Sequence, residues 1–264
     1  MTATVPVLMY HVIDKPRGEG EQRLCCHPAE FERQMTYLAE SEWRVVSLTA
    51  LLDAAGAGQS LPDKTVAITF DDGTSCTFER ALPILRRLGF PATVFVVAGM
   101  VGGRNEWMCR EGHPERAMLS TAQLRELESH GIEVGSHSVN HVRLAGLSGV
   151  ALEREVVGSK ERLEDLICRP VRHFAYPYGS FDAAAVQAVR TAGYVSACST
   201  IMGRNSLSGI DRFALQRTEI KGDDALWQFK LKLVFGTHDM PPWSIPRATL
   251  KEILARVGLH QTTS

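Results

Sequence analysis

Short apolar runs of strand type alternate with amphipathic runs of helical spacing along most of this chain, and this alternation constrains its fold more than any other feature. The strand-like runs lie at 5–13, 65–70, 92–97, 132–137, the start of 173–179, 194–200 and 212–220. The helix-like runs lie at 27–41, 77–89, 121–130, 150–167, 182–192, 223–235 and 247–257. Such alternation is typical of βαβ units that build a mostly parallel sheet.

The number of strand–helix units favours a (β/α) barrel over an open sheet in a chain of 264 residues. We therefore expect one α/β domain over residues 1–264. The run TVAITF at 65–70 has the continuous apolar character of a strand buried on both faces. Ser120 with Gln123 predicts a capping box at the start of the helix that follows.

Composition and charge exclude several functions. The formal net charge is −1, so no basic field favours nucleic acid or an anionic membrane surface. The chain contains no apolar run of the roughly 18–20 residues that a membrane span needs, and its N-terminus lacks the pattern of a secretory signal. We therefore expect a soluble, cytoplasmic protein. Its six cysteines form no CxxC pair, which predicts free thiols.

Two adjacent carboxylates, Asp71 and Asp72, end the strand at 65–70 and are followed by Gly73. Active sites of parallel α/β folds lie at the carboxyl ends of strands, so this position suits catalysis. Two structural interpretations stay open: a tight Asp-Gly hairpin turn, or an N-cap for the next helix. The helical spacing after Gly73 argues against the hairpin.

Two histidines four residues apart, His137 and His141, follow the strand at 132–137. In an extended strand their rings would lie about 13 Å apart, too far to share an ion. If the chain turns helical after Gly135, the two side chains lie about 5–6 Å apart on one face. The structural alternative is a pair of surface histidines near a helix cap.

Both motifs end apolar strands, so each is expected to face the same mouth of a parallel barrel. One aspartate and two histidines supply three protein ligands and leave a position open for water, which is the composition of a catalytic metal site. The second carboxylate is then free to act as a base.

These motifs resemble those of the polysaccharide deacetylases with a NodB-type domain, carbohydrate esterase family 4. ITFDDG (68–73), SHSVNH (136–141) and FAYPYG (174–179) are similar to three ordered motifs of that family, and looser similarity covers roughly residues 5–235. The branch most similar is that of the poly-N-acetylglucosamine deacetylases. The resemblance implies a distorted (β/α) barrel with about seven parallel strands, and hydrolysis of an N-acetyl or O-acetyl group on a sugar.

Carried over residue by residue, the resemblance assigns a divalent ion to Asp72, His137 and His141. The ion is most often zinc, with cobalt, nickel or iron as alternatives. The resemblance also implies that Asp71 is the general base and that the backbone N–H of Tyr178 helps to form an oxyanion hole.

The chain departs from the family pattern at two places. Many members carry an arginine in the third motif that holds the catalytic aspartate, and Ala175 stands there in this chain. Arg169, Arg172 or Arg217 could substitute for it. The family's histidine general acid near the last strand has no clear match, and His11, at the end of the first strand, is a candidate.

We predict a metal-dependent carbohydrate N-deacetylase that takes part in polysaccharide biosynthesis. Its substrate would be an N-acetylglucosamine-type polysaccharide, oligosaccharide or glycolipid precursor. The alternatives are an O-acetyl carbohydrate esterase, a carbohydrate-binding relative that has lost catalysis, and a barrel without a metal. The sequence leaves the glycan length, the physiological metal and the oligomeric state open.

Overall fold

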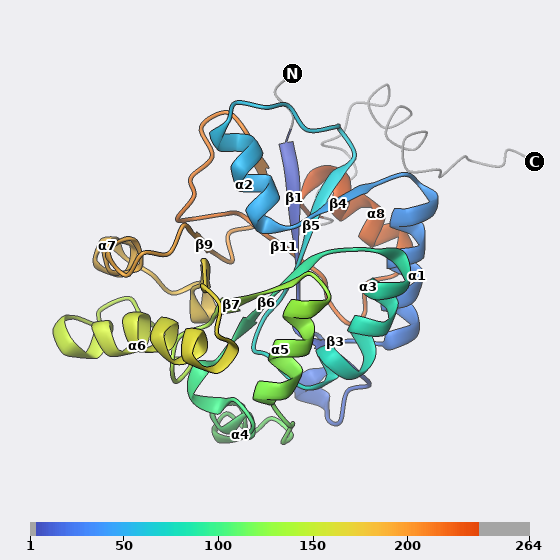
Figure 1. Cartoon of the computed structure of the whole chain (residues 1–264). Coiled ribbons are helices and arrows are strands. Elements are labelled where there is room, and N and C mark those ends of the chain that lie inside the picture. Colours follow the sequence, from blue (N-terminus) through green and yellow to red (C-terminus); the bar gives the residue numbers. More distant parts are fainter. Residues whose placement is uncertain (1–3, 238–264) are drawn as a thin grey trace, which may run out of the picture.

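The computed structural model describes residues 4–237, so the helix expected at 247–257 lies outside the described residues. Six strands lie side by side in one parallel sheet that curls into a distorted barrel (Figure 1). They are β1 (Thr4–Tyr10), β5 (Thr65–Phe70), β6 (Ala92–Val96), β7 (Ile132–Ser136), β8 (His173–Ala175) and β9 (Ser196–Cys198). The predicted α/β fold with a distorted barrel is confirmed.

Three short strands pair with β5 or β1 of this sheet. β4 (Arg44–Val46) pairs in parallel with β5, and β10 (Arg204–Ser206) pairs antiparallel with β1. β11 (Thr218–Glu219) pairs in parallel with β1, while Leu215 just before it forms a parallel bridge with Cys198 of β9. The segment from Leu215 to Glu219 thus connects the last strand to the first. The predicted strand at 212–220 is therefore regular only at its end.

Helices cover the outside of the sheet (Figure 1). The longer ones are α1 (Pro28–Glu40), α2 (Leu48–Gly56), α3 (Leu82–Leu88), α5 (Thr121–Ser129), α6 (Gly149–Ile167), α7 (Ala183–Thr191) and α8 (Leu226–Phe235). The shorter ones are η1 (Glu19–Glu21), η2 (Thr77–Ala81), η3 (Ala98–Met100), α4 (Glu106–Arg110) and η4 (Pro177–Gly179). Sequence patterns missed α2 and α4, while the predicted capping box of Ser120 and Gln123 is present. Within residues 4–237 no helix is long and apolar enough to cross a membrane.

The strand predicted at 5–13 is interrupted at His11, which corrects that prediction. β1 ends at Tyr10, and β2 (Val12–Ile13) pairs instead with β3 (Cys25–Cys26) in a separate two-stranded sheet. His11 is half-buried and stands at the tip of β1, where the chain changes sheet. The six cysteines are free, as expected.

The strands alternate between two hydrophobic clusters because successive side chains point to opposite faces. Leu8 and Tyr10 of β1 pack in the large cluster between sheet and helices, whereas Val5 and Val7 pack in a smaller cluster inside the barrel. On β7, Gly135 leaves room for a neighbouring ring inside the barrel: a Cβ there would lie 2.5 Å from the ring of Phe95. The apolar layer inside the barrel lies below the strand tips.

A polar cluster centred on His173 lies inside the barrel at the amino-terminal ends of the strands. The ring of His173 is 1% exposed. Its Nδ1 lies 2.8 Å from Ser196 Oγ and its Nε2 lies 2.9 Å from Thr49 Oγ1. Burial lowers the pKa of His173 to about 4, although the charge of Glu133 acts in the opposite direction. His173 therefore stays neutral in the folded protein at neutral pH.

This pKa predicts acid sensitivity between pH 6.5 and pH 4. Over that range the unfolded chain binds a proton at His173 that the folded chain does not, so the free energy of unfolding should fall by a few kcal/mol as the pH drops. Urea unfolding at several pH values measures this slope. The variant His173→Gln, which cannot titrate, should be less stable at pH 7 but show a flatter slope. Equal slopes for the two proteins contradict the assignment.

Candidate metal centre and active site

The strand tips bring Asp72, His137 and His141 together at one mouth of the barrel, as predicted. Their ligand atoms all lie within 4.8 Å of one another, and all three side chains are buried. Asp72 Oδ1 lies 3.7 Å from His137 Nε2 and 3.3 Å from His141 Nε2. These residues come from segments after β5 and β7 that are far apart in sequence.

Asp71 and Asp72 diverge because the chain leaves the strand between them. The backbone N–H of Asp71 still bonds to the carbonyl of Tyr10, 2.9 Å away, so Asp71 continues the ladder of β5. Asp72 then adopts a left-handed φ of 71° and Gly73 one of 79°. The next element is the helical segment η2, which rules out the hairpin interpretation. The Asp72 carboxylate turns instead toward the two histidines.

Asp71 forms a buried, bidentate ion pair with Arg217. Arg217 Nη1 and Nη2 lie 2.6 and 2.7 Å from the two carboxylate oxygens of Asp71, and Arg217 Nε donates to the carbonyl of Ser199 at 2.8 Å. Burial raises the pKa of Asp71, but the charge of Arg217 outweighs it, so the pKa lies below its usual range. Of the three arginines proposed to replace the one missing at Ala175, Arg217 contacts Asp71, whereas Arg169 and Arg172 are exposed.

His137 is oriented by a backbone carbonyl. Its Nδ1 lies 2.8 Å from the carbonyl oxygen of Ala175, to which it donates, so its Nε2 faces Asp72. Such a bond to the distal nitrogen of an imidazole is typical of metal-ligating histidines. Burial lowers the pKa of His137 to about 4, which keeps the imidazole neutral, as a ligand must be. Ala175 thus contributes through its backbone, although it lacks the family's arginine side chain.

His141 reaches the site through a loop rather than through the expected helical turn. No helix begins until α6, and Ser138 and His141 instead adopt left-handed φ values of 62° and 55°. The centroids of the two imidazoles lie 4.8 Å apart. Trp107 of α4 stacks on His141 with a centroid distance of 4.6 Å, so the loop expected at 99–119 closes one side of the site. The two histidines lie close together, as predicted, but a left-handed loop brings them together and not a helical turn.

The residues present fit a divalent metal ion. Two ligand atoms bound about 2.0–2.1 Å from a tetrahedral ion lie about 3.3 Å apart. The two separations of 3.3 and 3.7 Å between Asp72 Oδ1 and the Nε2 atoms are close to this value. One carboxylate and two imidazoles are also the ligand types that zinc and similar ions accept.

Tyr178 lies beside the metal centre and is held from two sides. Its backbone has a left-handed φ of 57°, and its ring centroid lies 4.5 Å from that of His141. Its hydroxyl donates to Glu111 Oε1 at 2.6 Å, and the guanidinium carbon of Arg143 lies 4.3 Å from the ring centroid. Glu111 was not predicted, because an exposed charge in a loop has no spacing that could identify it. His11 follows Tyr10, which pairs with Phe70, so His11 stands at the strand tips beside the two aspartates.

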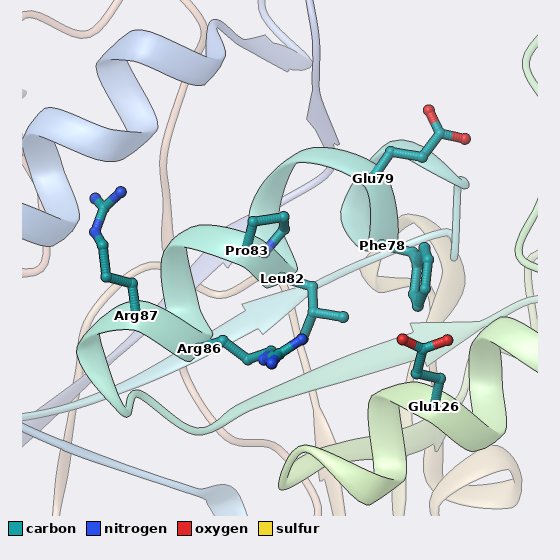
Figure 2. Close-up of a pocket in the computed structure, with 7 residues that line it drawn as sticks. All are labelled: Phe78, Glu79, Leu82, Pro83, Arg86, Arg87 and Glu126. Atoms are coloured by element: carbon teal, nitrogen blue, oxygen red, sulfur yellow. The ribbon is translucent and has the colours of Figure 1, made fainter.

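A separate surface groove of about 530 Å³ does not belong to this site. It is lined by Phe78 and Glu79 of η2, by Glu126 of α5 and by part of α3, including Leu82 (Figure 2). None of its residues belongs to the group formed by Asp72 and the two histidines, and its walls are helices on the outside of the barrel.

A barrel with this site at its mouth can be compared with families of known proteins. The sequence profile of the family described as polysaccharide deacetylase matches residues 58–197, which is more than half of the chain, and the chain belongs to that family. The matched region includes Asp71, Asp72, His137, His141 and Tyr178. Arg217 and His11 lie outside it.

The individual proteins that match this chain have low sequence identity to it. The Bacillus subtilis protein YxkH is 26% identical over 218 residues, which cover 83% of this chain and 72% of that protein. Poly-beta-1,6-N-acetyl-D-glucosamine N-deacetylases of Staphylococcus aureus are 25% identical over 174 residues. That match covers 62% of this chain and 57% of theirs, so the chain spans little more than half the length of these relatives. Streptococcus pyogenes deacetylase PplD, solved in complex with acetate, shares the fold with a TM-score of 0.76, 23% identity and coverage of 88% of this chain and 99% of that one.

Removing one member of the ion pair should destabilise the protein strongly. In Arg217→Met the Asp71 carboxylate is left buried without its cation, which should lower the free energy of unfolding by about 3–5 kcal/mol. The double variant Asp71→Asn/Arg217→Met removes both charges and should recover part of this loss. Urea unfolding measures all three proteins.

The exposed Arg172 provides the control, because Arg172→Met should change stability by less than about 0.5 kcal/mol. A loss below about 1 kcal/mol in Arg217→Met, or no recovery in the double variant, contradicts the role given to the pair.

Proposed function

We propose that this protein is a metal-dependent hydrolase that removes acetyl groups from N-acetylglucosamine-type sugars. The observation that carries the proposal is the arrangement of two neighbouring carboxylates, one beside an imidazole pair and the other paired with a buried arginine. The substrate would be a polysaccharide, an oligosaccharide or a glycolipid precursor.

The relatives support the choice of an N-acetyl substrate. The Staphylococcus aureus relatives are named for N-deacetylation of poly-beta-1,6-N-acetyl-D-glucosamine. Because this chain spans 57% of their length, their substrate is carried over here as a proposal only. The intact ion pair between Asp71 and Arg217 favours a working enzyme over a binding protein, since a buried pair of charges is costly to keep without a use.

Asp72, His137 and His141 would hold the ion, which we propose to be zinc. When bound, a zinc ion polarises a carbonyl oxygen and lowers the pKa of a coordinated water toward 7. Asp71 acts as the general base: Arg217 keeps it ionised, and its place beside Asp72 lets it accept a proton from the attacking water. Burial keeps His137 neutral, and its bond to the Ala175 carbonyl holds the ring with Nε2 toward Asp72.

Tyr178 and His11 complete the proposed mechanism. The backbone N–H of Tyr178 donates to the oxyanion of the tetrahedral intermediate, a contribution of about 10²–10³ in rate for a typical donor. His11, half-buried at the tip of β1, donates a proton to the departing amine. Tyr10, the residue before His11, pairs with Phe70, the residue before the two aspartates, and this register supports His11 in that role.

The proposal predicts acetate release from a β-1,6-linked N-acetylglucosamine oligosaccharide by the zinc-loaded protein. The measurement is acetate in a coupled assay together with free amine on the sugar. Asp71→Asn should lower kcat by about 10²–10⁴-fold, the usual contribution of a general base, while zinc content stays at the wild-type level. The exposed Asp165 gives a matched control, and Asp165→Asn should retain wild-type activity.

The same assay separates the alternatives. Acetate release from an O-acetylated glycan but not from the N-acetylated one would favour an O-acetyl esterase. Glycan binding without release of acetate, at saturating zinc or cobalt, would contradict an enzymatic function.

A further inference from the structure

The loop between β7 and α6 carries both histidines in a backbone conformation that its own residues disfavour. Ser138 and His141 have φ values of 62° and 55°. The left-handed region costs an ordinary residue about 1–2 kcal/mol, and such a conformation persists only where surrounding contacts hold it. Within the loop, one bond helps: the backbone N–H of His141 donates to Ser138 Oγ at 3.0 Å. The remaining support must come from other elements.

One side chain of α6, Glu155, supplies three contacts to this loop. Its Oε2 accepts hydrogen bonds from the backbone N–H groups of Val139, at 3.1 Å, and Asn140, at 2.9 Å. Its Oε1 accepts a third from the side-chain amide of Asn140, at 2.7 Å. The two residues that it holds lie between Ser138 and His141, so Glu155 fixes the middle of the turn.

The opposite side of the loop is held by the backbone after β6. The N–H of Ala98 donates to the carbonyl of Ser138 at 2.9 Å, and the N–H of Gly99 donates to the carbonyl of Val139 at 2.8 Å. In these bonds the carbonyl groups of the loop accept, whereas the N–H groups of the loop donate to Glu155. Without Glu155, two backbone donors of the turn would lose their protein partner.

The burial of Glu155 indicates a specific use. Its side chain is 3% exposed, and among residues 4–237 it takes part in no ion pair. Acidic side chains are rarely buried so fully unless paired. Here three N–H groups take the place of a cation. On the same face of α6, one turn later, Ser159 Oγ accepts a hydrogen bond from Ser136 Oγ at 2.8 Å, so α6 holds both the end of β7 and the loop that follows.

We propose that Glu155 is a positioning residue for the metal centre: by fixing the turn between His137 and His141, it sets the affinity of the site for a divalent cation. The inference rests on the proposed function, because it requires that these histidines bind an ion. It gives α6 a role in the site, although Glu155 does not touch the ligand atoms.

The test measures zinc affinity rather than activity, on the full chain stripped of metal and titrated against a chromogenic zinc chelator. Glu155→Leu removes all three acceptor contacts and should weaken zinc binding about 10–100-fold, the usual cost of losing an outer partner of a metal ligand. Glu155→Gln keeps an oxygen that can accept the backbone bonds and should stay within about threefold of wild type. If Glu155→Leu does not fold, Glu155→Asp, which is too short to reach the loop, should weaken binding at least about fivefold.

Glu164 on α6 provides the control for general destabilisation. Its Oε1 accepts hydrogen bonds from the N–H of Val171 at 2.8 Å and from the ammonium group of Lys160, and neither partner belongs to the histidine loop. Glu164→Gln should lower Tm while leaving zinc affinity within about twofold of wild type.

The outcomes separate the two levels of the proposal. A wild-type protein that binds no zinc overturns the metal centre itself. Zinc binding by wild type together with unchanged affinity in a folded Glu155→Leu or Glu155→Asp overturns only the role of Glu155. A loss in Glu155→Gln as large as that in Glu155→Leu also contradicts positioning by hydrogen bonds.

Discussion

Inside the mouth of the barrel, the guanidinium of Arg217 binds both carboxylate oxygens of Asp71, and the division of labour in the site depends on this ion pair. A carboxylate held in this way keeps its charge and has a fixed direction. Asp72, one residue later, is turned to the other side by its left-handed backbone and faces the imidazoles. Two adjacent aspartates therefore meet different partners, so one can bind a cation while the other remains available as a base.

The barrel interior supports this arrangement in layers. At the amino-terminal ends of the strands, His173 forms hydrogen bonds with the hydroxyl groups of Ser196 and Thr49. An apolar layer follows, which contains Val7, Phe95 and Leu215. Arg217 follows this layer and is fully buried. Its Nε donates to the carbonyl of Ser199, and its two terminal nitrogens donate to the carboxylate of Asp71. The low dielectric of such surroundings strengthens the pair and makes the loss of either partner costly.

Much of this could be predicted from the sequence, because the informative signals were local. Strand and helix periodicity gave the parallel barrel, and motif spacing gave the residues that converge at its mouth. For the partner of Asp71, the sequence offered three candidate arginines and no means of choosing among them. Arg217 lies 146 positions from Asp71, and no local pattern connects the two. The left-handed conformation of Ser138 could not be predicted from the sequence either, because residues with a Cβ rarely adopt it. It is explained by the contacts that the loop makes with Glu155 and with the backbone after β6. His11 became a candidate because it lies near the end of the first strand, and that strand ends at Tyr10, earlier than predicted.

The most direct test of the account is anomalous X-ray scattering from crystals of the zinc-loaded protein, recorded on both sides of the zinc absorption edge. We expect one strong peak at the barrel mouth, within bonding distance of Asp72, His137 and His141, with Asp71 bound to Arg217 and outside the coordination sphere. A peak bound to Asp71 in place of its arginine, or zinc only at other positions, would contradict the separate roles assigned to the two aspartates.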